Sequence, residues 1–112
     1  MSDLINVTVL VENTAFGPGA RGEHGLAFWI EAGSKGVLFD TGPGPDVLVH
    51  NAEHLGIDLA STDAVVLSHG HYDHTGGLME VLKRAGKIPL FLHPGALIPR
   101  YSRKKDGTVR IL

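Results

Sequence analysis

Three histidines and one aspartate fall within six consecutive residues near the middle of the sequence, at His69, His71, Asp73 and His74. Neutral imidazole is the commonest protein ligand for transition metals, and carboxylate is a frequent second choice. His69 and His71 are two residues apart, so in an extended loop their side chains point the same way. Asp73 and His74 are adjacent, diverge slightly and reach a second point nearby. The spacing therefore predicts two neighbouring metal sites, an arrangement that holds a hydroxide nucleophile and clamps an in-line displacement.

Two further histidines, His50 and His54, are four residues apart with Glu53 between them. They share one face of an expected helix, but the glutamate is misplaced for the H-E-x-x-H pattern of zinc proteases. The apolar residues of this helix lie on the opposite face. We therefore expect this pair to be exposed to solvent.

Two isolated histidines are candidate substrate-proximal residues. His24 lies in a glycine-rich loop over residues 13–25, and His93 follows an apolar run. His93 is also a weaker candidate for a metal ligand. A basic cluster downstream suits a phosphate or phosphodiester substrate, with a solvated loop as the alternative. Its members are Arg100, Arg103, Lys104 and Lys105.

Alternating and apolar patterns predict the elements that position these residues. Strands are expected over 4–11, 26–32, 35–39, 64–67 and 88–92, and helices from Pro45 to Gly56 and over 78–85. Residues 68–77 are expected to form a loop, and a strand begins near residue 108. Strands come first, followed by alternating strands and helices, which is typical of a layered α/β fold with one side exposed or missing. Phe28, Trp29 and Phe39 are expected in the core.

Composition narrows the possible chemistry. The chain has 112 residues, enough for one small domain or part of one, and a net charge of −2 without a basic bias, which argues against nucleic-acid binding. It has no cysteine, so any metal site uses His, Asp, Glu or backbone oxygen, which suits zinc, manganese or iron. Neither a signal peptide nor a membrane-spanning run is visible, so we expect a cytoplasmic protein.

The central residues resemble a known family. His69-Gly70-His71-Tyr72-Asp73-His74 is similar to the H-x-H-x-D-H signature of the metallo-β-lactamase superfamily, and residues 75–78 extend the match. Leu38-Phe39-Asp40-Thr41-Gly42 resembles the superfamily's upstream strand-end aspartate. Residues 23–28 and 93–97 resemble the branch of 7,8-dihydropterin-6-methyl-4-(β-D-ribofuranosyl)-aminobenzene-5′-phosphate synthase-like proteins.

The resemblance implies a fold and a set of roles. The fold would be the N-terminal half of an αββα sandwich, a mixed β-sheet with helices on one face, with residues 1–112 forming part of a single domain. His69 and His71 would bind a first metal, and Asp73 and His74 a second, zinc being expected before manganese or iron. Asp73 would also hold the attacking water, and Asp40 would orient the histidine loop from beneath. The activity would be hydrolysis of a phosphoester, ester or amide-like substrate, a phosphorylated small molecule being one option, by a hydroxide that the metals hold.

The same resemblance implies ligands that this sequence lacks. The superfamily also uses a downstream histidine for the first metal, a bridging aspartate and a final histidine for the second. In this branch the first of these lies in a Gly-Cys-Ser-His-like segment, and the chain has no cysteine. Three hypotheses follow: an inactive fragment, a half that completes its site with a second copy or another chain, and a non-catalytic metal-binding module. Half a sandwich would also expose an apolar sheet face.

Overall fold

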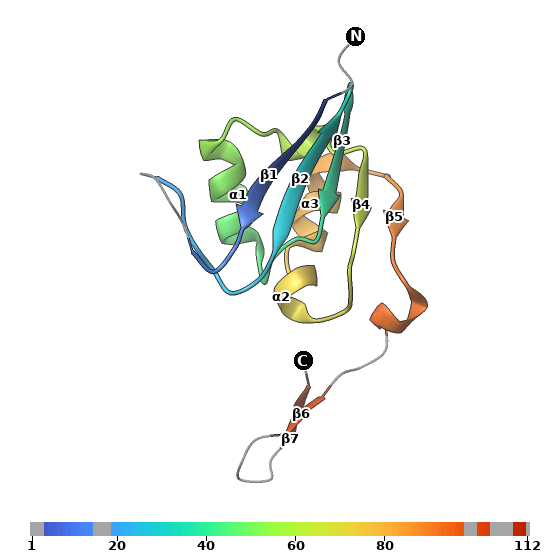
Figure 1. Ribbon diagram of the computed structural model, residues 1–112. Coiled ribbons are helices and arrows are strands. Elements are labelled where there is room, and N and C mark those ends of the chain that lie inside the picture. The colour runs from blue at the N-terminus through green and yellow to red at the C-terminus, as the bar shows by residue number, and fades with distance from the viewer. Residues whose placement is uncertain (1–3, 15–18, 98–100, 104–108, 112) are drawn as a thin grey trace.

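The computed structural model describes residues 4–14, 19–97, 101–103 and 109–111. Its main feature is a five-stranded mixed sheet in the order β1-β2-β3-β4-β5 (Figure 1). The first three strands are antiparallel, and β4 and β5 continue the sheet in parallel with β3. The strands are β1 (Ile5–Val11), β2 (Ala27–Ala32), β3 (Lys35–Phe39), β4 (Ala64–Val66) and β5 (Leu90–Phe91).

A tight hairpin joins β2 to β3, as predicted. Ala32 pairs with Lys35 across the two-residue turn, and Gly33 has a φ of 62°. Such a positive φ costs a residue with a Cβ atom but costs glycine little. The turn fixes the register in which Phe28 pairs with Phe39 and Trp29 with Leu38.

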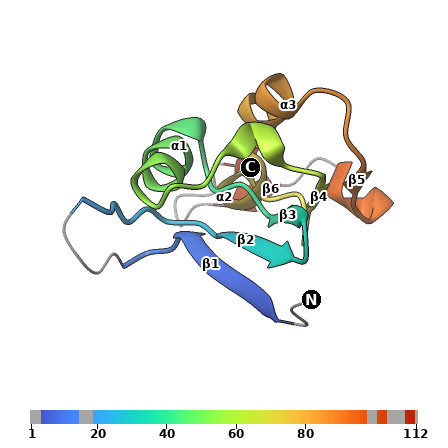
Figure 2. The same cartoon turned by 90° about the horizontal axis from the view of Figure 1, so that it is seen from above.

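The helices cover one face of the sheet (Figure 2). They are α1 (Pro45–His54), α2 (Tyr72–Thr75) and α3 (Leu78–Ala85), with 3-10 turns η1 (Leu59–Ser61) and η2 (Pro94–Leu97). The start of α1 at Pro45 and the end of α3 before Gly86 were both predicted. The core lies between this layer and the sheet, where Leu48 of α1 and Val81 of α3 are fully buried. Their partners in the core cluster include Leu10, Trp29, Leu38 and Val65 of the strands.

In the described part of the chain, no helix covers the opposite face of the sheet (Figure 2). This face carries an apolar row. Strand pairing aligns one residue from each strand along it: Val9, Phe28, Phe39, Val66 and Phe91. The two outermost residues are 50% and 57% exposed, and Phe28 and Phe39 stack with ring centroids 6.3 Å apart. The core prediction is thus right for Trp29, but Phe28 and Phe39 lie half-buried on the open face, because adjacent strand residues point to opposite sides.

Two sequence-based assignments are wrong, and one further strand was not predicted. Residues 68–77 contain α2 rather than loop alone, and a four-residue helix is too short to produce a helical period. The strand expected over 88–92 is reduced to Leu90–Phe91 at the sheet edge, and it is not buried. The strand expected near residue 108 is β7 (Val109–Ile111), which pairs with the unpredicted β6 (Tyr101–Arg103) in a separate hairpin.

Candidate metal centre

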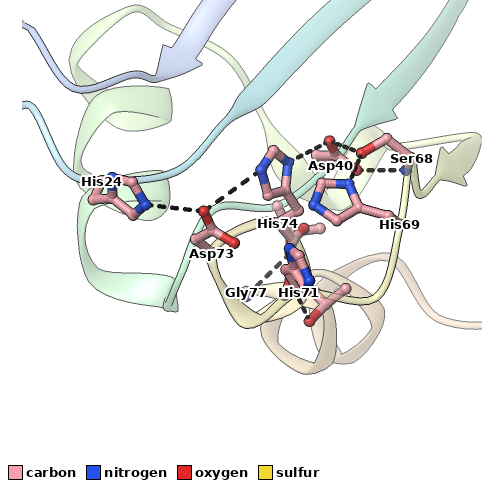
Figure 3. Close-up of polar contacts among 10 residues, drawn as sticks. His24, Asp40, Ser68, His69, His71, Asp73, His74 and Gly77 are labelled. Carbon is pink, nitrogen blue, oxygen red and sulfur yellow. Dashed lines mark hydrogen bonds and ion pairs between the residues drawn. The ribbon is translucent and has the colours of Figure 1, made fainter. Parts of the chain in front are cut away.

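The motif lies where two parallel strands end. Asp40 follows β3 directly, and Ser68 and His69 come shortly after β4, whose Val66 pairs with Phe39. Parallel strands bring their carboxyl ends to the same edge of a sheet, which is where ligand sites form in such folds. Residues that are nearly thirty positions apart in sequence therefore meet in one place (Figure 3).

His69, His71 and Asp73 offer one ligand atom each, and these atoms all lie within 4.8 Å of one another. The ring of His74 is close as well, its centroid 4.2 Å from that of His69. Its Nε2 atom lies 3.6 Å from Oδ2 of Asp73. The structure thus brings all four motif residues together. The ligand atom of Asp73 lies in the same group as those of His69 and His71. The division of these residues between two metals stays a prediction.

Asp40 is fully buried beneath these imidazoles. Its Oδ1 atom accepts a hydrogen bond from the Ser68 backbone over 2.8 Å, and its Oδ2 atom accepts one from the Ser68 hydroxyl over 2.6 Å. Nδ1 of His74 lies 2.7 Å from the same Oδ2 atom. Asp40 also has a φ of 59°, a region that aspartate tolerates better than most residues. These contacts join Asp40 to both Ser68 and His74, and its role in orienting the histidine loop stays a prediction.

Thr41, which lies just after β3, forms hydrogen bonds to the short helix α2. The backbone N–H and the hydroxyl of Thr41 both donate to the carbonyl oxygen of His74. The same hydroxyl accepts from the backbone N–H of Gly77 over 3.1 Å. The sequence analysis missed both Thr41 and Ser68, although a hydroxyl residue directly after a strand-end aspartate and directly before the first histidine was the available signal.

Two glycines after α2 are required because the backbone of another segment lies too close to leave room for a side chain. Their backbone angles are ordinary. Gly76 and Gly77 have φ values of −64° and −90°, which any residue adopts. A Cβ atom on Gly76 would collide with the carbonyl oxygen of Pro43, and one on Gly77 would lie 2.5 Å from the carbonyl oxygen of Thr41. The motif therefore packs directly onto the backbone of the β3–α1 loop.

The other histidines differ in their relation to the centre. Nε2 of His24 lies 3.2 Å from Oδ2 of Asp73, and the His24 side chain is 73% exposed (Figure 3). His93 is exposed and accepts a hydrogen bond from Gly95, and it borders an open hollow that Leu67 also lines. His50 and His54 stack on each other on α1, and His50 contacts the carbonyl oxygen of Gly19.

The basic cluster is only partly within the described chain. Arg100, Lys104 and Lys105 lie outside the described residues, and Arg103 belongs to β6. A phosphate-binding role for the cluster stays a prediction.

Electrostatics favour the neutral form of His69. Burial lowers its pKa below the ordinary value of 6.5, and the neighbouring His74 and His71 lower it further, while Asp40 and Asp73 act in the opposite direction. A neutral imidazole has the lone pair that a metal ligand needs. Nitrogen and carboxylate donors without thiolate also fit zinc, manganese or iron.

Two kinds of sequence comparison identify the family. A family model described as the metallo-beta-lactamase superfamily matches residues 20–111. The chain is 40% identical over 98 residues to 7,8-dihydropterin-6-methyl-4-(beta-D-ribofuranosyl)-aminobenzene-5'-phosphate synthase of Methanocaldococcus jannaschii, covering 82% of this chain and 33% of that protein. It is 29% identical over 117 residues to the probable metallo-hydrolase YflN of Bacillus subtilis, covering 95% of this chain and 44% of that protein. The chain therefore spans less than half the length of these relatives.

Solved structures agree on the fold. A subclass B3 metallo-beta-lactamase of Bradyrhizobium japonicum aligns with a TM-score of 0.51 and 29% identity, over 58% of this chain and 25% of that one. The Rm3 metallo-beta-lactamase aligns with a TM-score of 0.56 and 25% identity, over 75% of this chain and 28% of that one. They confirm the predicted fold class, a mixed sheet with helices on one face, while the assignment of residues 1–112 to one domain stays a prediction. From the family match and these alignments together, the chain belongs to the metallo-beta-lactamase superfamily.

Proposed function

We propose that this chain carries part of the metal centre of a hydrolase that cleaves a phosphoester, ester or amide-like bond. The observation that supports this most directly is the convergence of ligand atoms from His69, His71 and Asp73 within 4.8 Å. Three protein ligands with an open position are what catalytic zinc requires. When bound, the metal polarises the bond to be cleaved and lowers the pKa of a water molecule. Zinc is the first candidate, followed by manganese and iron.

Asp73 is the proposed catalytic residue. Its Oδ2 atom lies 3.2 Å from Nε2 of the exposed His24 and 3.6 Å from Nε2 of the half-buried His74, so the carboxylate lies between the solvent side and the motif imidazoles. In the proposed reaction this carboxylate orients the attacking water and accepts its proton. His24 reaches Asp73 from an exposed position, which suits a residue beside the substrate.

Two named relatives bear on the type of reaction and on the substrate. The relative from Methanocaldococcus jannaschii is named a synthase of a 5'-phosphate compound, whereas the relative from Bacillus subtilis is named a probable metallo-hydrolase. We prefer a hydrolase because the centre offers imidazole and carboxylate groups, which can hold a metal ion that activates water. A phosphorylated small molecule is the proposed substrate, and we propose no nucleic-acid or membrane partner. None of the described helices has the length and apolarity needed to cross a membrane.

We further propose that the second metal site is completed by another polypeptide segment, with a second copy of this chain as the first candidate. Among the described residues, His74 and a shared Asp73 are the groups that remain for that site after the first is filled. The open sheet face supports a packing partner, because Ile5 and Val7 of β1 are 65% and 58% exposed on it beside Val9, and Phe91 is 57% exposed at the opposite edge of the same face. Contiguous apolar surface of this kind usually marks an interface.

The test is metal content per chain, measured by elemental analysis on a size-exclusion peak whose mass is known from light scattering. The hydrolase proposal predicts at least one zinc per chain, lost in His69→Ala and in His71→Ala. His54→Ala is the matched control, since His54 lies on α1 away from the centre and should leave the metal in place. Two metals per chain in a dimer would support completion by a second copy.

Activity is then measured on chromogenic phosphodiester and ester substrates, with Asp73→Asn as the diagnostic variant. Because Asp73 is also a proposed ligand, the zinc content of this variant is measured in parallel. Loss of turnover with retained zinc would support the catalytic role of the carboxylate, and loss of zinc would support its role as a ligand. Bound zinc without turnover on any of these substrates would instead favour the non-catalytic module. A stable monomer that binds no zinc, manganese or iron would refute the metal centre for this chain.

A further inference from the structure

We propose that Ser68 connects the buried carboxylate of Asp40 to His69, so that Asp40 sets the tautomers of both His69 and His74 and directs their Nε2 atoms to the metal. This inference deepens the proposed function, and only its metal-affinity consequence rests on that function. It assigns Ser68 as a positioning residue, which acts through His69 rather than on the substrate.

The argument begins with His74. Its Nδ1 atom lies 2.7 Å from Oδ2 of Asp40, whose side chain is fully buried. A carboxylate has no hydrogen to donate, so the neutral imidazole must carry its hydrogen on Nδ1. The lone pair is then on Nε2, the atom that faces Asp73.

Ser68 extends the same logic to His69. The Ser68 hydroxyl lies 2.6 Å from Oδ2 of Asp40 and 2.8 Å from Nδ1 of His69. It has one hydrogen for two neighbours, and the carboxylate oxygen can only accept. If the hydroxyl donated to His69, two oxygen lone pairs would face each other at 2.6 Å beside a buried charge. The hydroxyl therefore donates to Asp40 and accepts from Nδ1 of His69, as Figure 3 allows the reader to follow.

His71 provides an internal contrast. Its ring meets that of His69 edge-on, with centroids 4.7 Å apart, and no ring nitrogen of His71 has a hydrogen-bond partner in the described part of the chain. The network thus fixes two of the three motif imidazoles and leaves the third to exchange between its tautomers. Hydrogen bonds from the outer shell are the usual means of fixing the tautomer of a ligating histidine.

The experiment is ¹⁵N NMR of the imidazoles in the full, metal-free chain, at a pH where they are neutral. His69 and His74 should each show a protonated-type Nδ1 and an unprotonated-type Nε2, whereas His71 should show averaged values. In Ser68→Ala, His69 should shift to averaged values while His74 stays unchanged. Ser68→Thr retains the hydroxyl and should restore the wild-type pattern for His69.

Ser61→Ala is the matched control, because Ser61 bonds its hydroxyl to the carbonyl oxygen of Asp58 on an exposed turn. It should leave all three patterns unchanged. Protonation of His69 at Nε2 in the wild type, or an unaltered His69 in a folded Ser68→Ala variant, would overturn the proposal. A dispersed amide spectrum establishes that the variant is folded, and solid-state spectra of sedimented protein give the same readout if the chain self-associates.

A second readout is zinc affinity by competition with a chelator. Loss of such an outer-shell hydrogen bond weakens metal binding by about 10- to 100-fold, so Ser68→Ala should fall in that range and Ser68→Thr should recover. If the wild type binds none of zinc, manganese and iron, the proposed function fails, but the NMR measurement still tests the role of Ser68 independently of metal binding.

Discussion

The hydroxyl and the backbone N–H of Thr41 both donate to one atom, the carbonyl oxygen of His74, over 2.9 and 2.7 Å. The hydroxyl also accepts from Gly77, so a single side chain ties the end of β3 to both ends of the turn that follows His74. Thr41 is fully buried, and water cannot replace these bonds. The position of His74 over Asp40 therefore depends on a residue that would contact neither metal nor substrate.

Replacing Thr41 by valine tests this dependence. Thr41→Val keeps the shape but leaves the buried N–H of Gly77 without an acceptor, which costs about 1–3 kcal/mol of the free energy of unfolding. Urea denaturation measures the change. Thr14→Val, on an exposed loop, should stay within about 0.5 kcal/mol. Equal stability of the two variants would show that the Thr41 hydroxyl does not hold the motif.

Replacing Gly76 by alanine tests the close packing of α2 on the β3–α1 loop. The added Cβ atom would collide with the carbonyl oxygen of Pro43, so backbone must move and overpacking costs about 1–3 kcal/mol. Gly44→Ala is the control, because its Cβ would meet no atom within 4 Å and its backbone is extended. Thermal unfolding should rank Gly76→Ala well below Gly44→Ala, and the reverse order would contradict the structure.

The lowered pKa of His69 predicts how the metal-free chain responds to acid. Burial is the main cause, followed by the nearby His74 and His71. Well above pH 6.5 His69 is neutral in both the folded and the unfolded chain, so the free energy of unfolding does not change with pH through this residue. As the pH falls below 6.5 the unfolded chain takes up the proton first, so the free energy of unfolding decreases until the folded chain is protonated as well.

The measurement is an NMR titration of the His69 Cε1 proton. Its midpoint should lie below 6.5 in the folded chain and return to about 6.5 in the chain unfolded by urea. A folded-state midpoint above 6.5 would mean that the aspartates outweigh burial. The zinc-binding form should lose its metal to protons only at correspondingly lower pH.

The open sheet face predicts self-association that one charge can weaken. Val7 is 58% exposed on the edge strand β1 and pairs with Ile30 on β2, so Val7→Lys places a charge among the exposed apolar residues of that strand. Light scattering across a concentration series should show a lower mass for this variant than for the wild type. Met79→Lys is the control, since Met79 is 75% exposed on α3 at the helical side. A wild-type chain that stays monomeric at all concentrations would remove this face as an interface between copies.

The sequence by itself determined the four residues of the candidate centre and most of the scaffold. His69, His71, Asp73 and His74 lie within six residues shortly after a strand, so they stay near one another in any compact form of that segment. The β2–β3 hairpin, the start of α1 and the bounds of α3 follow from local turn chemistry and periodicity, which need no long-range information. The family follows from the same short motif.

Tertiary structure decided what surrounds that motif. Asp40 and Ser68 are 28 residues apart and meet only because β3 and β4 pair in parallel, so no local pattern reveals their hydrogen bonds. The four-residue helix α2 packs on the β3–α1 loop because Thr41 forms a hydrogen bond to it and because Gly76 has no side chain to separate the two backbones. The sides taken by Phe28 and Phe39 likewise depend on which face the helices cover. A sequence supplies the donors and acceptors, and the packing of distant segments decides which of them meet.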